Sequence, residues 1–480
     1  MTRWAIAWRS VTQRALASSL TALSMAMGVA LVTGVLLTYG MVSRSFMGNS
    51  NLGYGLIAGA KGGKLQLVLN TTYYLSEPVE NIPYDFYQQF LTADQQRKEL
   101  ELMSKDVLGE VKDGKYAQHT DFAIPVCLGD YYKRFRVVGT LPKFFELFRD
   151  PYDDEEPRYH FAQGRNFKTW DEEHGYYEAV VGSIVARETG LKLGDKIAAS
   201  HGSDEGHAHD ESPFIVVGIL APSGTPNDRG VFINMEGFYL MEGHAKPVDD
   251  EAPDSSPETK KEAKLRRDPL PIDQREVTAV LIRTNDPFSP IFIRNAVNEG
   301  SVAQVVLPVL EITNLFEMIV SPIQTLLLVI TVLICIVSGI SILVSIYNSM
   351  NDRKHEIAVM RALGASRGTV MSVVLLESVI LSVGGGLIGW TIGHGMMAAA
   401  SPMIEAKTGV SIGFFDMAPL PMSVEARIGP AIINSLPTFL RGLLSLELLI
   451  IPGLIFLAVL VGFLPAYTAY KTDVAESLGD

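Results

Sequence analysis

Four long apolar stretches divide the chain and predict helices that cross a membrane. They cover residues 15–43, 322–347, about 371–400 and 448–470. Each reaches or exceeds the roughly 20 residues that a helix needs to span the hydrocarbon of a bilayer. We expect the first stretch to be retained, because the apolar core of a cleavable signal peptide is shorter. The pattern therefore predicts four transmembrane α-helices, one near the N-terminus and three near the C-terminus.

Basic residues beside these stretches predict the orientation. Arg3, Arg9 and Arg14 precede the first stretch, and Lys471 follows the last. Since the cytoplasmic flanks of membrane helices are enriched in Lys and Arg, we expect both termini in the cytosol and residues 45–321 outside. The mixture of basic and apolar residues in the N-terminal tail predicts a helix that lies in the membrane interface.

The polar insert at residues 45–321 predicts a separate domain with its own core. Short β-branched runs between turn residues are typical of strands, and apolar residues at helical spacing are typical of helices. The expected strands are 122–127, 135–139, 179–182, 214–220 and 278–283, and the expected helices are 84–90, 184–190 and 291–297. We therefore expect an integral membrane protein with a large α+β extracytoplasmic domain between its first and second transmembrane helices. The domain boundaries that follow are 1–44, 45–321 and 322–480.

Two loops of the insert differ from the rest. Residues 246–273 are dense in Pro, Asp, Glu, Lys and Ser, so we expect them to be disordered. The other loop gathers His201, His207 and His209 with four carboxylates. Two histidines and a carboxylate could bind zinc. The alternative is a solvated acidic loop, because His207 and His209 do not have the spacing of a closed structural zinc site.

The glycine-rich segment at residues 53–64 resembles a phosphate-binding loop only superficially. A P-loop requires Ser or Thr directly after its Lys, whereas Leu65 follows Lys64. Leu65, Leu67 and Leu69 alternate with Gln66 and Val68, which predicts a strand after a glycine turn.

Composition excludes several classes of function. The net charge of −13 argues against a nucleic-acid-binding protein, which would carry basic stripes. The two cysteines, Cys127 and Cys335, predict no disulfide framework. No zincin-type His-Glu-x-x-His motif is present. We therefore expect no catalytic activity in this chain alone.

The segment between the second and third apolar stretches predicts a short amphipathic helix at about residues 351–367. Ile357, Met360, Arg361 and Gly364 recur at helical spacing, and the glycine is placed to end the helix. The segment is basic in a chain that is acidic overall, which favours a cytoplasmic loop.

This segment carries a family resemblance. The run from Arg353 to Arg367, RKHEIAVMRALGASR, resembles the signature of FtsX/MacB-type permeases of ABC transporters. The closing run at residues 464–478 is similar to the end of these permeases, although Val474 stands where a proline is usual. With the arrangement of spans, the resemblance covers the first 45 and the last 160 residues. The α+β insert is similar, more loosely, to the MacB-like periplasmic core domain.

The resemblance implies that the amphipathic helix docks on an ATPase. The residues that would couple to the ATPase are Arg353, Glu356, Ile357, Met360, Arg361, Leu363 and Gly364. The chain would be a permease subunit in a bacterial inner membrane that transmits ATP-driven motion to its periplasmic domain and so moves a periplasmic or lipid-anchored substrate. Transport through the spans is disfavoured, since they carry almost no charge that could line a hydrophilic path.

The resemblance also implies the partners. ATP and Mg²⁺ would bind to a separate ATPase subunit, and this chain would need no cofactor. Further expected partners are a second permease chain, membrane lipid, and a periplasmic adaptor or lipoprotein. Two alternatives remain open: a non-transporting signalling scaffold that regulates a cell-wall hydrolase, and metal-linked export through the His-rich loop.

Two polar residues lie within the third apolar stretch. Glu377 is a candidate functional residue because buried membrane carboxylates are costly, and pairing with a basic residue near the headgroups is the alternative. We expect His394 to lie in the outer interface without a special role. The glycines at 384–386, 389 and 393 predict a close approach of helices.

Overall fold

The chain divides into two compact units. The computed structural model describes residues 2–49, 52–103, 111–150, 153–201, 213–241, 270–352, 354–408, 410–418, 447 and 450–471. One unit, here called the sheet unit, is Ser45–Phe316, and the other, the helical unit, combines Met1–Arg44 with Glu317–Asp480. The N-terminal boundary between them falls inside helix α2, so one uninterrupted helix belongs to both units.

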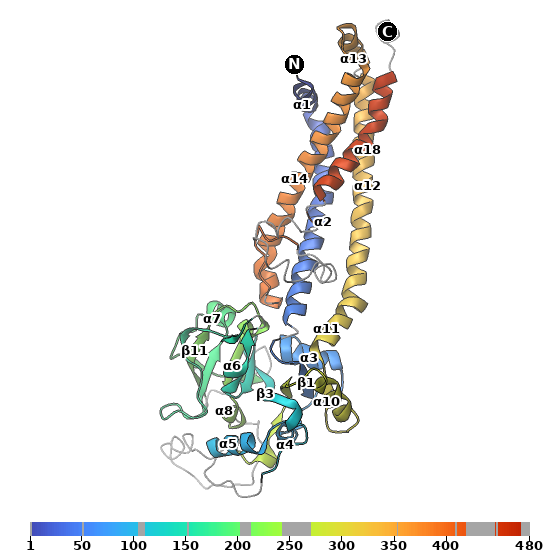
Figure 1. The fold of residues 1–480 in the computed structure, drawn as a ribbon. Coiled ribbons are helices and arrows are strands. Elements are labelled where there is room, and N and C mark those ends of the chain that lie inside the picture. The colour runs from blue at the N-terminus through green and yellow to red at the C-terminus, as the bar shows by residue number, and fades with distance from the viewer. Residues whose placement is uncertain are drawn as a thin grey trace. The chain divides into compact units, whose positions relative to one another are not determined.

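The helical unit contains the long helices of the chain (Figure 1). Its helices are α1 (Arg3–Gln13), α2 (Ala15–Asn49), α12 (Ser321–Asp352), α13 (Lys354–Ala362), α14 (Arg367–Thr408) and α18 (Ile450–Lys471). Among the described residues, three helical segments are long and apolar enough to cross a membrane: Ala15–Met47, Pro308–Ile334 and Arg367–Glu405. The fourth predicted stretch forms α18, which contains a shorter apolar segment, Pro452–Tyr467.

Glycines of α14 bring this helix against α2, as the sequence predicts. A Cβ atom added at Gly385 would lie 2.7 Å from the carbonyl oxygen of Ala22, and one added at Gly389 would overlap the carbonyl oxygen of Ala26. Gly393 continues the same stripe one turn later. Small residues let helix backbones approach closely, and such contacts are a main source of helix association in membranes.

The sheet unit is built on a mixed β-sheet (Figure 1). The strand order is β15-β1-β14-β3-β4-β12-β8-β11-β7, with β10 pairing β3 and β9 pairing β11. The β4–β12 and β8–β11 pairs are parallel and the others antiparallel. The strands of this sheet are β1 (Leu56–Gly59), β3 (Thr120–Tyr132), β4 (Phe135–Thr140), β7 (Phe161–Gly164), β8 (Glu178–Val181), β9 (Lys196–Ile197), β10 (Ser200–His201), β11 (Phe214–Leu220), β12 (Gly230–Asn234), β14 (Ala279–Thr284) and β15 (Gln304–Val306). All five strands expected from the sequence are confirmed.

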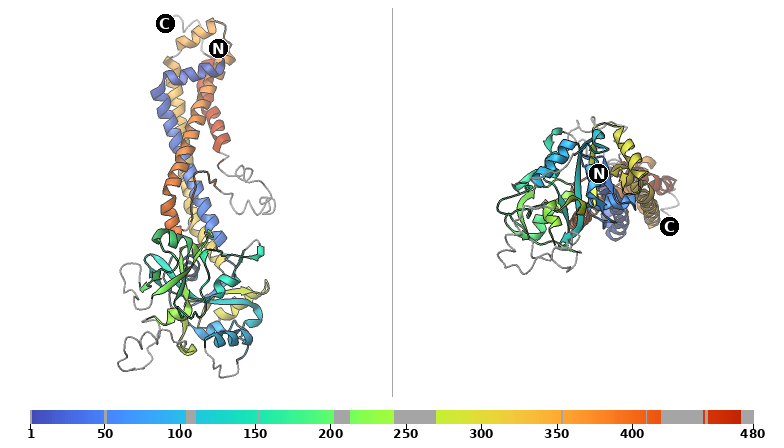
Figure 2. Two further views of the ribbon diagram at one scale, coloured as in Figure 1. Left: turned by 90° about the vertical axis from the view of Figure 1, so that its left-hand side faces the viewer. Right: turned by 90° about the horizontal axis from the view of Figure 1, so that it is seen from below.

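Short helices and small strand pairs surround this sheet (Figure 2). The helices are α3 (Lys64–Tyr73), α4 (Tyr84–Gln88), α5 (Ala93–Met103), α6 (Lys143–Leu147), α7 (Ser183–Thr189), α8 (Met235–Tyr239), α10 (Ser289–Asn298) and α11 (Pro308–Leu315), with short 3₁₀ turns η1 (Ala117–His119), η2 (Pro226–Arg229) and η3 (Ile272–Gln274), and a π-helical turn η4 (Phe316–Val320) before α12. Strand β2 (Ile82–Pro83) pairs β13 (Glu276–Val277), and β5 (Arg149–Asp150) pairs β6 (Asp153–Pro157). The three helices expected in this part of the chain are confirmed as α4, α7 and α10. The mixture confirms the α+β class.

The predicted strand at Leu65–Leu69 is wrong, because these residues lie in helix α3. The strand, β1, precedes the glycine turn, and the helix follows it. In the helix Leu67 and Val68 are buried, and Leu67 packs where a side chain at Gly59 of β1 would otherwise lie. Leucines at every second position fit a helix as well as a strand when the positions between them are also buried. The pattern at residues 65–69 was therefore ambiguous between the two.

The predicted disordered stretch at residues 246–273 is wrong at its C-terminal end. Its first part lies outside the described residues. Leu270 is buried, and its carbonyl oxygen accepts a hydrogen bond from Arg275 Nε at 2.6 Å. Ile272 begins the turn η3. The side chains of Leu270 and Ile272 pack into the apolar core of the sheet unit, and this packing orders the end of the loop.

A buried ion pair lies within the core of the sheet unit. The Arg275 guanidinium donates two hydrogen bonds to Glu236, at 2.7 and 3.0 Å, and both side chains are 1% exposed. Burial raises the pKa of Glu236, although the guanidinium favours its charged form. The pair fixes the segment before β13 to α8.

Candidate functional site

The predicted coupling segment forms the separate short helix α13 between α12 and α14. The helix ends as the sequence predicts: Gly364 has a φ of 99°, and the N–H groups of Gly364 and Ala365 bond to the carbonyl oxygens of Arg361 and Met360, each at 3.0 Å. Ser366 then caps α14 by accepting a hydrogen bond from the N–H of Thr369 at 3.2 Å. Because the turn and the cap consume residues 363–366, the helix is shorter than the expected 351–367.

One face of α13 is locked into the helical unit. Ile357 and Ala358 are buried, and Ile357 joins Val370 and Val374 of α14 in an apolar cluster. Met360 packs against the same cluster from the side. This half of α13 is therefore held by apolar packing.

The end of α13 and the turn after it present apolar side chains to the outside. Val359 of α13 is 39% exposed, and Leu363, the first residue after the helix, is 83% exposed. The N–H of Leu363 bonds to the carbonyl oxygen of Val359 at 3.0 Å, so the two residues lie one turn apart. Arg361 lies between them in the chain and is half-buried. Exposed apolar side chains that lie together are a common feature of surfaces that bind a partner protein.

The predicted coupling residues therefore divide into two sets. Ile357 and Met360 face inward, whereas Leu363 faces outward and Gly364 forms the turn. Glu356 belongs to α13, but its side chain lies outside the described part of the structure, as does Arg353 altogether. The segment thus has a buried side and an exposed side, and its coupling role stays a prediction.

Glu377 is buried in α14 and is bonded to the N-terminal helix. The Ser10 hydroxyl of α1 donates a hydrogen bond to Glu377 Oε1 at 3.0 Å. Figure 2 shows α1 lying across the end of the helical unit that also carries α13. The carboxylate thus ties the predicted interfacial helix to α14.

His394 is part of a buried polar cluster that the sequence interpretation missed. Its Nε2 lies 3.0 Å from Glu447 Oε2, and its Nδ1 lies 2.8 Å from the carbonyl oxygen of Phe414. Glu447 also accepts hydrogen bonds from Trp390 Nε1 at 3.3 Å and from the N–H of Ala418 at 2.8 Å. His394 is fully buried and bonded within the helical unit, and its position in the outer interface stays a prediction.

One of these hydrogen bonds has a defined direction. A carbonyl oxygen can only accept, so Nδ1 of His394 carries the hydrogen that bonds to Phe414. His394 and Glu447 are 53 positions apart, and no local pattern connects them.

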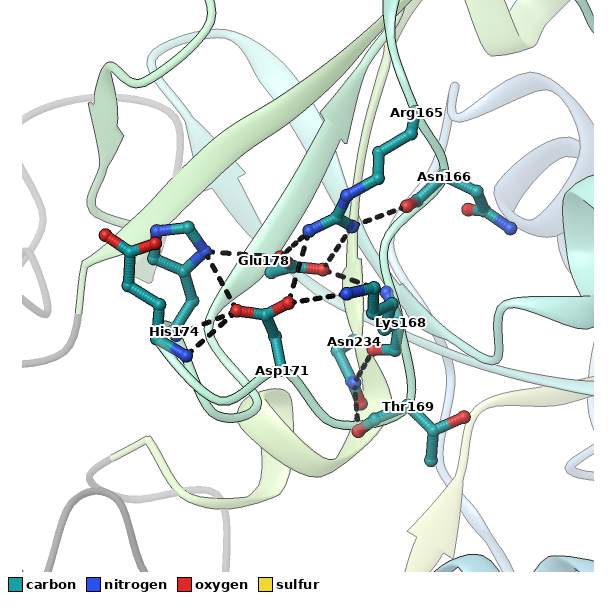
Figure 3. Close-up of polar contacts among 9 residues, drawn as sticks. Arg165, Asn166, Lys168, Thr169, Asp171, His174, Glu178 and Asn234 are labelled. Carbon is teal, nitrogen blue, oxygen red and sulfur yellow. Dashed lines mark hydrogen bonds and ion pairs between the residues drawn. The ribbon is translucent and has the colours of Figure 1, made fainter.

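The sheet unit contains a second polar cluster, shown in Figure 3. Asp171, His174 and Glu178 each offer a ligand atom, and these atoms lie within 4.8 Å of one another. Arg165 donates to Glu178 at 2.5 and 2.8 Å, and Lys168 donates to Asp171 at 2.9 Å. His174 Nδ1 lies 3.2 Å from Glu178 Oε1.

The carboxylates of this cluster are already neutralised by cations. The hydrogen bond from Lys168 lowers the pKa of Asp171 to about 2. Burial alone would raise the pKa of Glu178, but the bonds from Arg165 lower it overall. A metal ion would have to displace two cationic side chains, so the arrangement favours a structural ion-pair network.

As far as the described residues show it, this cluster contains none of the proposed zinc ligands. The backbone of His201 lies in β10, where it pairs with Asp130, and His207 and His209 lie outside the described residues. Zinc binding by the His-rich loop therefore stays a prediction.

Two protein families match the chain. The MacB-like periplasmic core domain matches residues 18–287, which is more than half of the chain. The FtsX-like permease C-terminal domain matches residues 328–474. The two matches together include α2, the strands β1 to β14, α13, α14 and α18.

Two relatives resemble shorter parts of the chain. An uncharacterized ABC transporter permease, YknZ of Bacillus subtilis, is 39% identical over 80 residues, which is 15% of this chain and 20% of that protein. The macrolide export ATP-binding/permease protein MacB of Bdellovibrio bacteriovorus is 36% identical over 78 residues, which is 16% of this chain and 12% of that protein. The chain therefore matches only a fifth or less of the length of these relatives.

Proposed function

Since the chain belongs to the family that carries the MacB-like periplasmic core domain, here with an FtsX-like permease C-terminal domain, we propose that it is the permease subunit of an ABC transporter. ATP is hydrolysed by a separate cytoplasmic subunit, and the chain converts that hydrolysis into motion of its sheet unit. The substrate lies outside the inner membrane or is anchored to it by lipid. The name of the Bdellovibrio relative combines ATP binding with permease activity, but the present sequence has no P-loop.

The two-faced packing of α13 is the observation that carries this proposal. Ile357 anchors the helix to the core of the helical unit, while Leu363 remains 83% exposed. An ATPase that binds Val359 and Leu363 more tightly in one of its states pulls or pushes α13 when it changes state. The differential affinity supplies the coupling free energy.

Motion of α13 reaches the rest of the helical unit through α14. The hydrogen-bonded turn at Gly364 and the cap at Ser366 leave no flexible linker between the two helices. α14 packs on α2 through its glycine stripe. Helix α2 continues without a break into the sheet unit, and it therefore serves as the mechanical connection.

We include α18 as the fourth membrane span. Its 22 residues give a length of about 33 Å, enough for the hydrocarbon core of a bilayer. With four spans and basic flanks at α1 and Lys471, both termini lie in the cytosol and the sheet unit lies in the periplasm.

We further propose a second copy of the chain as a partner, bound to α12. Only 6% of the most apolar part of segment Pro308–Ile334 is buried within the chain, against 44% for each of the other two spans. A span that its own chain covers so little has a large surface available for another helix or for lipid. Neither hydrolase regulation nor metal-linked export has a comparable observation in its favour among the described residues.

The test of the coupling role uses the ATPase encoded beside this chain. The variant Leu363→Ala removes the exposed apolar side chain that directly follows α13, and the control Ile388→Ala removes one that is 52% exposed in α14. We expect Leu363→Ala to lower complex formation and coupled ATP hydrolysis several-fold. The control should leave both unchanged.

Two outcomes would separate failure of the proposal from failure to fold. The thermal unfolding temperature in detergent shows whether the Leu363→Ala variant is as stable as the wild type. If the two temperatures are equal and the variant still binds and stimulates the ATPase, α13 is not the docking helix. If no ATPase binds to the wild-type chain, the transporter assignment itself fails.

A further inference from the structure

The helical unit contains an apolar cavity of about 270 Å³ between α14 and α18. Val383, Leu387 and Trp390 line it from α14, and Leu454 lines it from α18. Gly386 lies opposite Leu454, and any side chain at this glycine would overlap the leucine methyl group. Leu454 thus fills the space beside Gly386, and the two helices are in direct contact at this wall of the cavity.

Among the described residues, no polar atom of the lining faces into this cavity. Glu447 borders it, but its carboxylate oxygens are turned to His394, Trp390 and the N–H of Ala418. A cavity holds water only where polar partners are available, whereas an apolar cavity of about 150 Å³ stays dry and admits benzene. The larger cavity seen here is thus suited to a hydrocarbon.

The cavity opens at a surface that meets lipid. Leu387 lies in its wall and is 55% exposed, and the adjacent Ile388 is 52% exposed. Both residues lie within Arg367–Glu405, a segment apolar and long enough to span a membrane. Hydrocarbon chains of the bilayer are then the molecules that meet this opening at the highest concentration.

We propose that an acyl chain of a bilayer phospholipid occupies this cavity, beside the direct contact of α14 with α18 at Gly386 and Leu454. The His394–Glu447 pair closes the polar end, so that among the described residues the chain meets only apolar atoms and the indole of Trp390. The inference depends on α14 lying in a membrane and is independent of any ATPase.

Trp390 provides a direct reporter for the occupant. Bromine atoms on an acyl chain quench tryptophan fluorescence on contact. The full-length chain with Trp4, Trp8 and Trp170 each replaced by Phe retains Trp390 alone. This protein would be reconstituted, without ATPase, into phosphatidylcholine vesicles whose acyl chains are either dibrominated or unbrominated.

Two variants fill the cavity and one adds the same bulk elsewhere. Val383→Phe extends the α14 wall, Leu454→Phe extends the α18 wall, and Ile388→Phe adds a ring at the exposed neighbouring position. We expect brominated chains to remove most of the Trp390 fluorescence in the parent and in Ile388→Phe. Val383→Phe and Leu454→Phe should restore most of it.

The outcomes are decisive because phospholipid is the only source of acyl chains in these vesicles. An unquenched Trp390 in the parent would mean that no phospholipid chain enters the cavity. Equal quenching in all four proteins would mean that Trp390 meets only the surrounding bilayer. Circular dichroism and thermal unfolding of each variant verify that the comparison is made between folded proteins.

Discussion

The two units of this chain bury polar groups in opposite ways. The sheet unit encloses the bidentate Arg275–Glu236 ion pair among aromatic rings such as Tyr84 and Tyr239. The helical unit encloses glycines, and its buried polar side chains Glu377 and His394 are hydrogen-bonded to residues far from them in the sequence, Ser10 and Glu447. In water, apolar burial provides the driving force and the ion pair fixes the arrangement. In lipid that driving force is absent between helices, so close contact of small residues and interhelical hydrogen bonds replace it.

This difference predicts which substitutions each unit tolerates. The sheet unit should be most sensitive to the loss of one partner of a buried charge. The helical unit should be most sensitive to added volume at its glycines. The predictions below test this contrast, from the largest expected effect to the smallest.

The largest loss is expected for Glu236→Ala in the sheet unit. The substitution leaves the guanidinium of Arg275 buried without its carboxylate, which costs about 3–5 kcal/mol of unfolding free energy. Chemical denaturation of the full-length protein in detergent, followed by the fluorescence of Trp170, measures the loss. The double variant Glu236→Met with Arg275→Met removes both charges and should recover much of the stability. An equally unstable double variant would show that the pair contributes attraction beyond the cost of an uncompensated charge.

The second prediction concerns added volume in the helical unit. Gly389→Leu places a side chain into the backbone of α2 at Ala26 and should cost about 1–3 kcal/mol. Gly384→Leu is the matched control, because a Cβ at Gly384 has no atom within 4 Å. Thermal unfolding in detergent compares the two variants. If Gly384→Leu is as destabilising as Gly389→Leu, the glycine stripe is not what joins α14 to α2.

The third prediction uses acid to loosen the sheet unit. The pKa of Asp171 is about 2 in the folded protein, below its ordinary value of 3.8, so the unfolded chain binds more protons in this range. The contribution of Asp171 is therefore complete above about pH 4 and is lost as the pH falls toward about 2. Trp170 lies directly before Asp171 and contacts Tyr176, so its fluorescence reports the local change.

The variant Asp171→Asn isolates this contribution. At neutral pH it should lower the stability by about 1 kcal/mol, because the cations it loses are partly exposed. Over the acid range the variant should lose less stability than the wild type. Parallel acid transitions of the two proteins would contradict the assignment to Asp171.

The sequence predicted the helices, strands and helix ends that depend on residues close together in the chain. Apolar runs located the long helices, and β-branched runs located five strands. Gly364 ended α13 because a left-handed turn after a helix favours glycine. Helix α3 was missed because its leucines fit a period of two as well as a helix, and only Gly59 of β1 explains which face is buried.

Features that join distant parts of the chain could not be predicted in this way. Glu377 was expected to pair with a basic residue, and the structure adds a donor from the other end of the sequence, the Ser10 hydroxyl. His394 and Glu447 are 53 positions apart, and either residue alone suits an interface. The exposure of Leu363, unlike its helical position, also depends on how α13 packs on α14.

The smallest effect is expected for an exposed leucine of the helical unit, compared with a buried leucine of the same unit. Leu333 of α12 is 56% exposed, and Leu381 of α14 is buried. In detergent at high dilution, Leu333→Ala should change the unfolding free energy by less than about 0.5 kcal/mol, whereas Leu381→Ala should cost at least about 2 kcal/mol. If a second chain covers α12, Leu333→Ala becomes destabilising only at protein concentrations at which the wild type is dimeric, because binding to the folded state adds to its stability by mass action. A loss at high dilution as large as that of Leu381→Ala would show instead that α12 is covered by its own chain, and the proposal of a second copy at this helix would be wrong.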